Sequence, residues 1–209
     1  MNGYPLRIAE FIIPGQIRMR QTSGDSSDND LIRLALDGKI SAFKSLVERY
    51  EKRAYLYARG MIGNGEDAYD LSQEAFIRVY KSLNRFDQSY PFGVWFFTIL
   101  SNLCKNHLRK KYNRNEDINS EEFLDSLPAA ESSKPDQALF QSDIKRLVWE
   151  AISELPAKFR EIILLSHFEE MSYDQIAKAL NMHRGSVMSR LYYARRKLRE
   201  ILEKKGVDL

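Results

Sequence analysis

The chain contains the stretch SYDQIAKALNMHRGSVMSRLYYARR at residues 172–196, in which two helical patterns are separated by a short polar turn. Ser172 and Gln175 have the spacing of a capping box, which satisfies the unpaired amides at the start of a helix. Asn181 suits a left-handed turn position between the two helices. The stretch therefore predicts a helix-turn-helix.

The second helix of this motif has an apolar side and a polar, basic side. Apolar residues recur from Val187 at i, i+4, i+7 and i+11, which predicts a buried stripe. The other side fits a DNA major groove, where the first turns meet base edges and later basic residues meet phosphates. The residues predicted to face duplex DNA are Arg184, Ser186, Met188, Ser189, Arg190, Tyr192, Arg195 and Arg196.

Charge is unevenly distributed along the 209 residues, although the formal net charge is only +3. Basic residues cluster at 105–114, acidic residues follow at 116–136, and basic residues return between 184 and 205. This order predicts two modules that bind polyanions, joined by a solvated acidic tether.

Several classes of protein and site are disfavoured. No apolar stretch reaches the roughly 20 residues that cross a bilayer, so no membrane insertion is expected. Residues 1–20 lack the pattern of a signal peptide. Cys104 is the only cysteine, and we expect it to be a buried, inert thiol and not a redox sensor. The scattered histidines suggest no metal site, and the chain has no phosphate-binding glycine loop or nucleophile elbow, so neither a cofactor nor enzymatic activity is expected.

Helical periodicity extends over nearly the whole chain from Asp28 without strand alternation, so the predicted fold class is all-α with two helical domains. Helices are predicted at about 29–37, 41–62, 66–84, 91–112, 136–154, 157–168, 172–180 and 184–204. The predicted organisation is a flexible extension at 1–27, a first domain at 28–112, a flexible acidic linker at 113–135 and a second domain at 136–209. Within the extension, Met19 is an alternative start to Met1.

A second polar surface follows the helix predicted at 91–112. Thr98, Asn102, Lys105 and Arg109 recur along one side of it, and their amides and charges could contact bases and phosphates. The loop before this helix contains aromatic residues beside basic ones, which is the environment that an unstacked base needs. Trp95 and Phe96 are expected in the core, whereas for Phe86 and Tyr90 core packing and exposure to a base are both open.

Four motifs, taken in order, resemble the extracytoplasmic-function (ECF) group of the sigma-70 family of bacterial RNA polymerase sigma factors. They are DAYDLSQEAF at 67–76, Trp95 leading into NLCKNHLRK at 102–110, Leu155-Pro156, and the helix-turn-helix. The resemblance covers nearly all of residues 28–202. It implies that the first domain is region 2, the second is region 4, and the protein is a cytoplasmic sigma factor that directs core polymerase to promoters and assists their melting.

The resemblance also implies roles for individual residues. The helix at 66–84 shows a mixed charged surface, which by spacing alone favours exposure to solvent over docking. In the family this helix docks on the beta-prime coiled coil of polymerase, which implies contacts by Asp67, Asp70, Gln73, Glu74 and Arg78. Contacts with the minus-ten element are implied for Phe86, Tyr90, Thr98, Asn102, Lys105, Asn106, His107, Arg109 and Lys110. The second domain would read the minus-thirty-five element as duplex and bind the beta flap, and the linker would occupy the RNA exit path.

Three positions depart from the family pattern. His107 stands where many members carry Asp, Met188 occupies a position that is often basic, and His183 is a weaker N-cap than Ser or Asp. A helix-turn-helix regulator that binds DNA without polymerase is the alternative, but its first domain should carry a dimerisation or ligand site instead of groups suited to single strands. A further hypothesis is that the acidic linker or an anti-sigma protein masks the basic surfaces.

Overall fold

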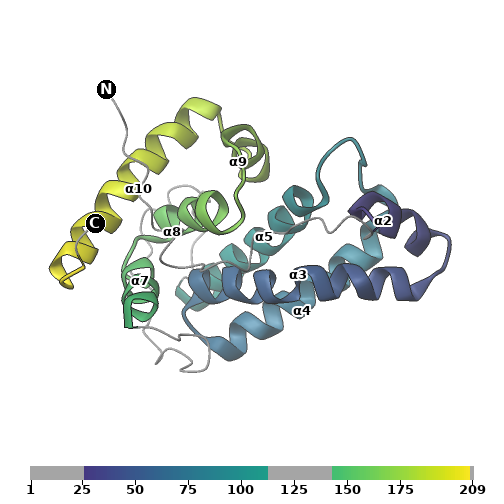
Figure 1. The fold of residues 1–209 in the computed structure, drawn as a ribbon, viewed down its shortest axis with the longest axis horizontal. Helices are drawn as coiled ribbons and strands as arrows, with labels where there is room; N and C mark the ends of the chain where they lie inside the picture. The colour runs from purple at the N-terminus through teal and green to yellow at the C-terminus, as the bar shows by residue number, and fades with distance from the viewer. Residues whose placement is uncertain (1–25, 113–142, 208–209) are drawn as a thin grey trace.

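The computed structural model describes residues 26–112 and 143–207, and these consist of helices and turns without a strand (Figure 1). The predicted all-α fold is thereby confirmed. Most of the predicted extension and all of the predicted linker lie outside the described residues. The elements are α2 (Asp28–Leu36), α3 (Ile40–Ile62), α4 (Gly65–Ser82), η1 (Leu83–Arg85), α5 (Phe92–Tyr112), α7 (Asp143–Ser153), α8 (Ala157–Ile163), η3 (Leu164–Phe168), α9 (Tyr173–Ala179) and α10 (Arg184–Lys204).

The helix-turn-helix begins and turns at the predicted residues. Ser172 Oγ accepts a hydrogen bond from the Gln175 amide at 3.3 Å, and the Gln175 side chain accepts one from the Ser172 amide at 2.8 Å. Asn181 has a left-handed φ of 52°. His183 precedes α10 without a side-chain capping bond, as expected of a weak N-cap. The local chemistry of residues 172–184 therefore determines where both helices start.

Side-chain caps and a glycine also set the helix ends of the first domain. Ser27 and Asp30 form a capping box that starts α2. Gly63, with φ of 82°, ends α3 in a conformation that other residues rarely adopt. Asn64 then accepts a hydrogen bond from the Asp67 amide at 3.1 Å and starts α4. The predicted turn between α3 and α4 thus joins two helices that pack against each other.

The core of the first domain is an aromatic cluster around α5. The ring of Phe96 lies 4.8 Å from that of Phe76 and 5.2 Å from that of Phe97, centroid to centroid. Phe96 is fully buried, as predicted, and Trp95 is partly buried against the same core. Phe97 and Leu100, which the sequence analysis does not place in the core, are also fully buried. They are buried because α5 packs against α3 and α4 on one side and against α9 on another.

The predicted inert thiol is confirmed. Cys104 is fully buried on α5, and burial raises its pKa well above the ordinary value. A thiol in such an environment stays protonated and unreactive at neutral pH.

One predicted helix is divided in the structure. The pattern at 157–168 predicts a continuous helix, but α8 ends at Ile163 and residues Leu164–Phe168 form a wider π-helical turn. The Glu169 amide bonds to the Leu164 carbonyl at 3.2 Å, five residues back. Leu164 and Glu169 contact α3 of the first domain, so this wide turn presents both residues to the other half of the molecule. Helical periodicity in sequence cannot distinguish such a turn from an ordinary one.

The two domains pack against each other (Figure 1). Helices α7 and α8 and the η3 turn contact α3, and α9 contacts α5. Gly60 allows the close approach, since a Cβ atom added there would lie 2.8 Å from a methyl group of Leu164 and 3.0 Å from the Trp149 ring. Two ionic contacts cross the same interface: Arg53 pairs with Glu169, and Lys105 Nζ lies 3.3 Å from Glu161. We call these residues, together with Ser101, the interdomain interface.

The weak cap of α10 gives a stability prediction. We expect His183→Ser to raise the free energy of unfolding by about 0.5–1 kcal/mol, because a serine hydroxyl can accept a bond from an amide of the first turn. Urea unfolding followed by circular dichroism measures the change. His183→Ala is the control and should give no gain. Equal stability of the Ser and Ala variants would show that α10 needs no cap.

Candidate functional site

Helix α10 presents a polar and basic surface to solvent above a buried stripe. Val187, Leu191, Ala194 and Leu198 are buried, as predicted. The opposite side includes large exposed side chains, with Met188 51% and Tyr192 64% exposed. Other members of the predicted reading surface that are exposed are Arg184, Ser186, Ser189 and Arg196. Helix α10 is therefore amphipathic, as a DNA-recognition helix must be. The contacts of these residues with DNA stay a prediction.

Two predicted DNA contacts on α10 are only partly exposed. Arg190 and Arg195 are of intermediate burial. Arg195 Nε donates a hydrogen bond to His167 Nε2 at 3.3 Å. Burial and the charge of Arg195 lower the pKa of His167 to about 4, so this imidazole is neutral and accepts the bond. Arg195 therefore has a partner within its own domain in addition to its predicted role.

A surface cleft of about 590 Å³ lies against the first turns of α10. Lys158 and Phe159 of α8 form one wall, and Tyr193, which is 53% exposed, belongs to the other. The remaining lining residues are His183, Gly185, Ser186, Ser189 and Arg190. Lys158 and Tyr193 were not predicted from the sequence, because Lys158 is distant in the chain from α10 and Tyr193 is of a type common in cores.

The polar side of α5 is partly occupied by internal contacts. Asn102, Asn106, Arg109 and Lys110 are exposed, and an Arg109 NH group donates to Asn106 Oδ1 at 3.1 Å. Thr98 donates its hydroxyl to the Val94 carbonyl at 2.7 Å. Lys105 is only 19% exposed, because it pairs with Glu161 of the second domain. These predicted residues therefore lie on one helix, but Lys105 is paired with a carboxylate and is not free to bind DNA.

The two aromatic residues of the 86–91 loop have different environments. Phe86 is 9% exposed, and its ring lies 5.0 Å from Trp95. A base could reach this ring only after the loop moves. Tyr90 is 43% exposed, and Lys178 of α9 lies over its ring. The question left open by the sequence thus has a different answer for each residue: core packing for Phe86 and exposure for Tyr90.

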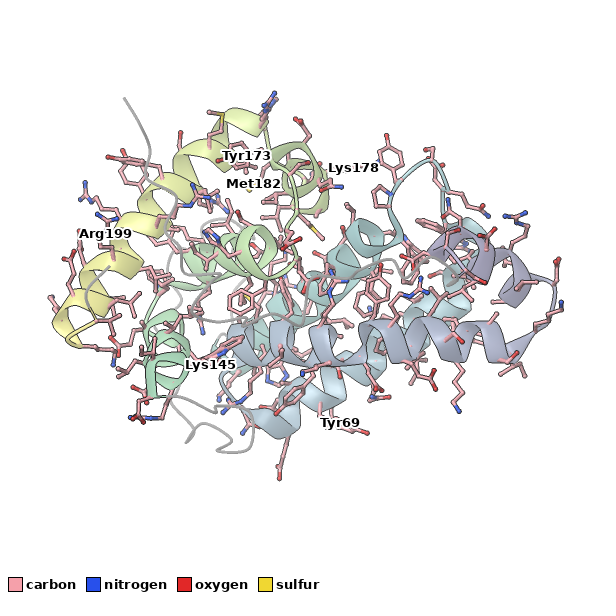
Figure 2. All side chains as sticks on the ribbon, viewed as in Figure 1. Tyr69, Lys145, Tyr173, Lys178, Met182 and Arg199 are labelled. Atoms are coloured by element: carbon pink, nitrogen blue, oxygen red, sulfur yellow. The ribbon has the colours of Figure 1, made fainter. Side chains whose placement is uncertain are left out.

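The outward surface of α4 contains apolar residues as well as charges. Tyr69, Ile77 and Tyr80 are each more than half exposed, and Tyr69 points away from the helix bundle (Figure 2). None of the three was predicted from the sequence as a site residue. Contiguous patches of exposed apolar side chains can mark interaction surfaces. Docking of α4 on a partner stays a prediction.

The charged residues predicted on α4 lie on the same helix surface. Asp70 is exposed, while Asp67, Gln73 and Glu74 are partly exposed. An Arg78 NH group lies 2.5 Å from Glu74 Oε1. Asp67 Oδ2 lies 3.4 Å from Nε2 of His107 on α5. His107 is thus beside a carboxylate of α4, and this contact joins the predicted polymerase-binding and minus-ten surfaces.

Among residues 26–112 and 143–207, no group of His, Cys, Asp and Glu could hold a metal ion. Nor do the described helices include one with the length and apolar character needed to cross a membrane.

Comparison with known proteins identifies both domains. The family model described as Sigma-70 region 2 matches residues 46–114, and that described as Sigma-70, region 4 matches residues 145–198. The ECF RNA polymerase sigma factor SigW of Bacillus subtilis (strain 168) is 31% identical over 176 residues, covering 82% of this chain and 94% of the relative. The RNA polymerase sigma-H factor of Pseudomonas aeruginosa is 30% identical over 181 residues, covering 84% and 94%.

A solved structure shares the fold. The sigma factor RpoE of Bartonella quintana, in complex with the anti-sigma factor NepR, has a TM-score of 0.62 and 24% identity. The similarity covers 77% of this chain and 96% of that one.

Proposed function

Because the chain belongs to the extracytoplasmic-function group of the sigma-70 family of RNA polymerase sigma factors, we propose that its two domains read one promoter in two physical forms. The second domain reads the minus-thirty-five element as duplex, and the first reads the minus-ten element after the strands separate. The assignment of duplex to one domain and single strand to the other is supported by the difference between their surfaces. Helix α10 exposes polar and basic side chains on a single helix, which fits a major groove, whereas the first domain combines aromatic rings with amides and cations.

The duplex-reading role rests on α10. Its exposed residues include hydroxyl, aromatic and guanidinium groups, which can contact base edges and phosphates. Met188 takes the place of a basic residue, so an apolar contact such as a thymine methyl fits this position better than guanine does. Lys158, across the cleft from the start of α10, adds a cation for the phosphate backbone.

The single-strand role rests on α5 and the 86–91 loop. Exposed Asn102 and Asn106 supply amides, and Arg109 and Lys110 supply cations for phosphates. Tyr90 can stack on an unpaired base once Lys178 moves off its ring, and Phe86 can do so when the loop moves. Base capture by such rings would shift the duplex toward its open form, which is how this protein would assist melting.

Docking on polymerase is assigned to α4. The exposed tyrosines and Ile77 supply apolar contact, and Asp70 and Glu74 supply charge that orients the partner. The partner is the beta-prime coiled coil, while the second domain binds the beta flap. The protein would carry out no reaction itself, since RNA synthesis belongs to polymerase. It would act in the cytoplasm, where polymerase is found, and be held inactive by an anti-sigma protein, as the solved relative is bound by one.

Charge reversal on α4 tests the docking surface. We expect Asp70→Lys combined with Glu74→Lys to weaken binding to core polymerase about tenfold or more, because like charges would then face each other across the interface. Affinity is measured with immobilised core enzyme. Glu48→Lys, an exposed reversal on α3, is the control and should bind normally. Unchanged binding by the double variant would return this surface to the solvated interpretation.

The capture loop gives a second prediction. Phe86→Leu keeps apolar volume in the core but removes the stacking ring, so we expect about a tenfold loss of transcription from duplex promoters. Templates that are already melted at the minus-ten element should show a much smaller loss, since they need no capture energy to open. Run-off transcription measures both, and Tyr90→Leu tests the neighbouring ring in the same way. Equal losses on the two templates would remove the capture role.

A further inference from the structure

Most of the large apolar side chains that the second domain exposes lie on α10. Among the described residues of this domain, they are Ile144 on α7 and Met188, Tyr192 and Tyr193 on α10. The three on α10 are each more than half exposed. Contact of such groups with water is unfavourable, so three of them close together on the helix assigned to duplex DNA indicate a contact surface.

Met188 and Tyr192 form one side of this surface. They are four residues apart and are therefore neighbours along α10. Four residues of helix rise about 6 Å, whereas one base pair rises about 3.4 Å, so the two side chains can reach base pairs that are about two apart. Tyr193 lines the cleft on another side of the helix, although its ring lies 5.4 Å from that of Tyr192. We call Met188 and Tyr192 the apolar ridge.

Small residues follow the helix beside the apolar ridge. Gly185 and Ser189 are exposed and one turn apart, and no atom lies within 4 Å of a Cβ atom added to Gly185. The Ser189 hydroxyl donates to the Gly185 carbonyl at 3.1 Å, so this side chain lies against the helix. Neither residue is large enough to hold the helix away from DNA, so the apolar ridge can reach the base edges of a major groove.

The arginines of the same helix have partners within the protein. Arg184 Nε lies 3.5 Å from Asp174 Oδ1, and Arg196 Nε lies 3.4 Å from Glu200 Oε1. Arg195 is bonded to a histidine of its own domain. Exposed pairs of this kind are weak, so a phosphate can replace the carboxylate. Recognition of guanine is more demanding, because two donors of one guanidinium must align with one base.

The group in the major groove that matches an apolar ridge is the methyl group of thymine. An A·T pair presents this methyl group there, whereas a G·C pair does not. A thioether chain or a phenol ring gains free energy when it covers a methyl group. A guanine oxygen or a cytosine amino group against the same side chain would lose water without gaining a hydrogen bond. The ridge thus favours thymine and disfavours the alternatives.

We propose that Met188 and Tyr192 select A·T pairs in the minus-thirty-five element, with two thymine methyl groups, about two base pairs apart, in contact with the apolar ridge. The selection rests on the proposed function, because it concerns the duplex that α10 reads. The ridge determines specificity, while the arginines of this helix contact phosphates and contribute affinity.

Selection of DNA by the assembled polymerase identifies the element. Core polymerase reconstituted with the full chain is mixed with a library of duplexes that are randomised at both promoter elements, and the bound DNA is sequenced. We expect the enriched upstream element to contain two thymines at the stated spacing. An enriched upstream element without them would overturn the proposal. Failure of the chain to bind core polymerase, or enrichment of no sequence, would overturn the proposed function and the base preference with it.

Replacement of thymine by deoxyuridine then tests the methyl groups alone. Deoxyuridine pairs as thymine does but lacks the 5-methyl group. Each thymine of the upstream element is replaced in turn, and affinity for the holoenzyme is measured by competition at fixed salt. Two replacements should each weaken binding about threefold to fourfold, and the others should have no effect. This test uses the wild-type chain, so it does not depend on the folding of a variant. Equal affinity for all of these duplexes would refute the methyl contacts.

Variants of the ridge assign each methyl group to a side chain. Met188→Ala should make binding insensitive to uracil at one position, and Tyr192→Ala at the other. Met188→Leu and Tyr192→Phe keep the apolar surface and should stay sensitive, the second because the tyrosine hydroxyl is not the reading group. Lys197→Ala, at an exposed position of the same helix, is the matched control and should affect the thymine and uracil duplexes equally. Sensitivity that survives in both alanine variants would show that other residues read the methyl groups and would contradict the proposal.

Discussion

Helix α5 must satisfy three environments at once, and the rest of the molecule depends on this constraint. Its aromatic residues, such as Phe96, complete the core of the first domain. Ser101 and Lys105 meet Glu161 of the second domain. Asn102 and Arg109 remain in water, on the surface assigned to DNA. A change in the packing of α5 would therefore reach the core, the interdomain interface and the DNA surface together.

The interdomain interface differs from this core because it combines ion pairs with apolar contacts. The aromatic cluster loses favourable contact with apolar neighbours if it is exposed, so the first domain opposes unfolding. The ion pairs of the interface gain hydration when exposed, whereas its apolar contacts, such as those of Leu164 and Trp149 beside Gly60, favour the packed form.

Features that depend on neighbouring residues could be predicted from sequence, and those that depend on distant pairing could not. The Ser172 capping box, the left-handed Asn181 and the apolar stripe of α10 each follow from spacing within a few turns, and the structure confirms them. The contact between Lys105 and Glu161 arises only when the two domains meet, and the π-helical turn has no signature in helical periodicity. The burial of Glu161 could not be predicted from the sequence, because a single acidic residue in a helical pattern is usually exposed to solvent.

The candidate site shows the same limit. Helical periodicity placed Asn102, Lys105 and Arg109 on one side of a helix, but it could not show that Lys105 pairs with Glu161 of the second domain. The exposed Ile77 and Tyr80 on α4 likewise became visible as an interaction surface only once the core was defined. Residue type and spacing thus identified the surfaces, while tertiary packing decides which of their groups are accessible.

The account is tested most directly by the distance between α4 and α10 in the free chain and in its complex with core polymerase. Single-molecule energy transfer between dyes at exposed positions on these helices reports it in solution, with the buried Cys104 left unlabelled. The account predicts a longer distance on polymerase than in the free chain. The same distance in both states would contradict it.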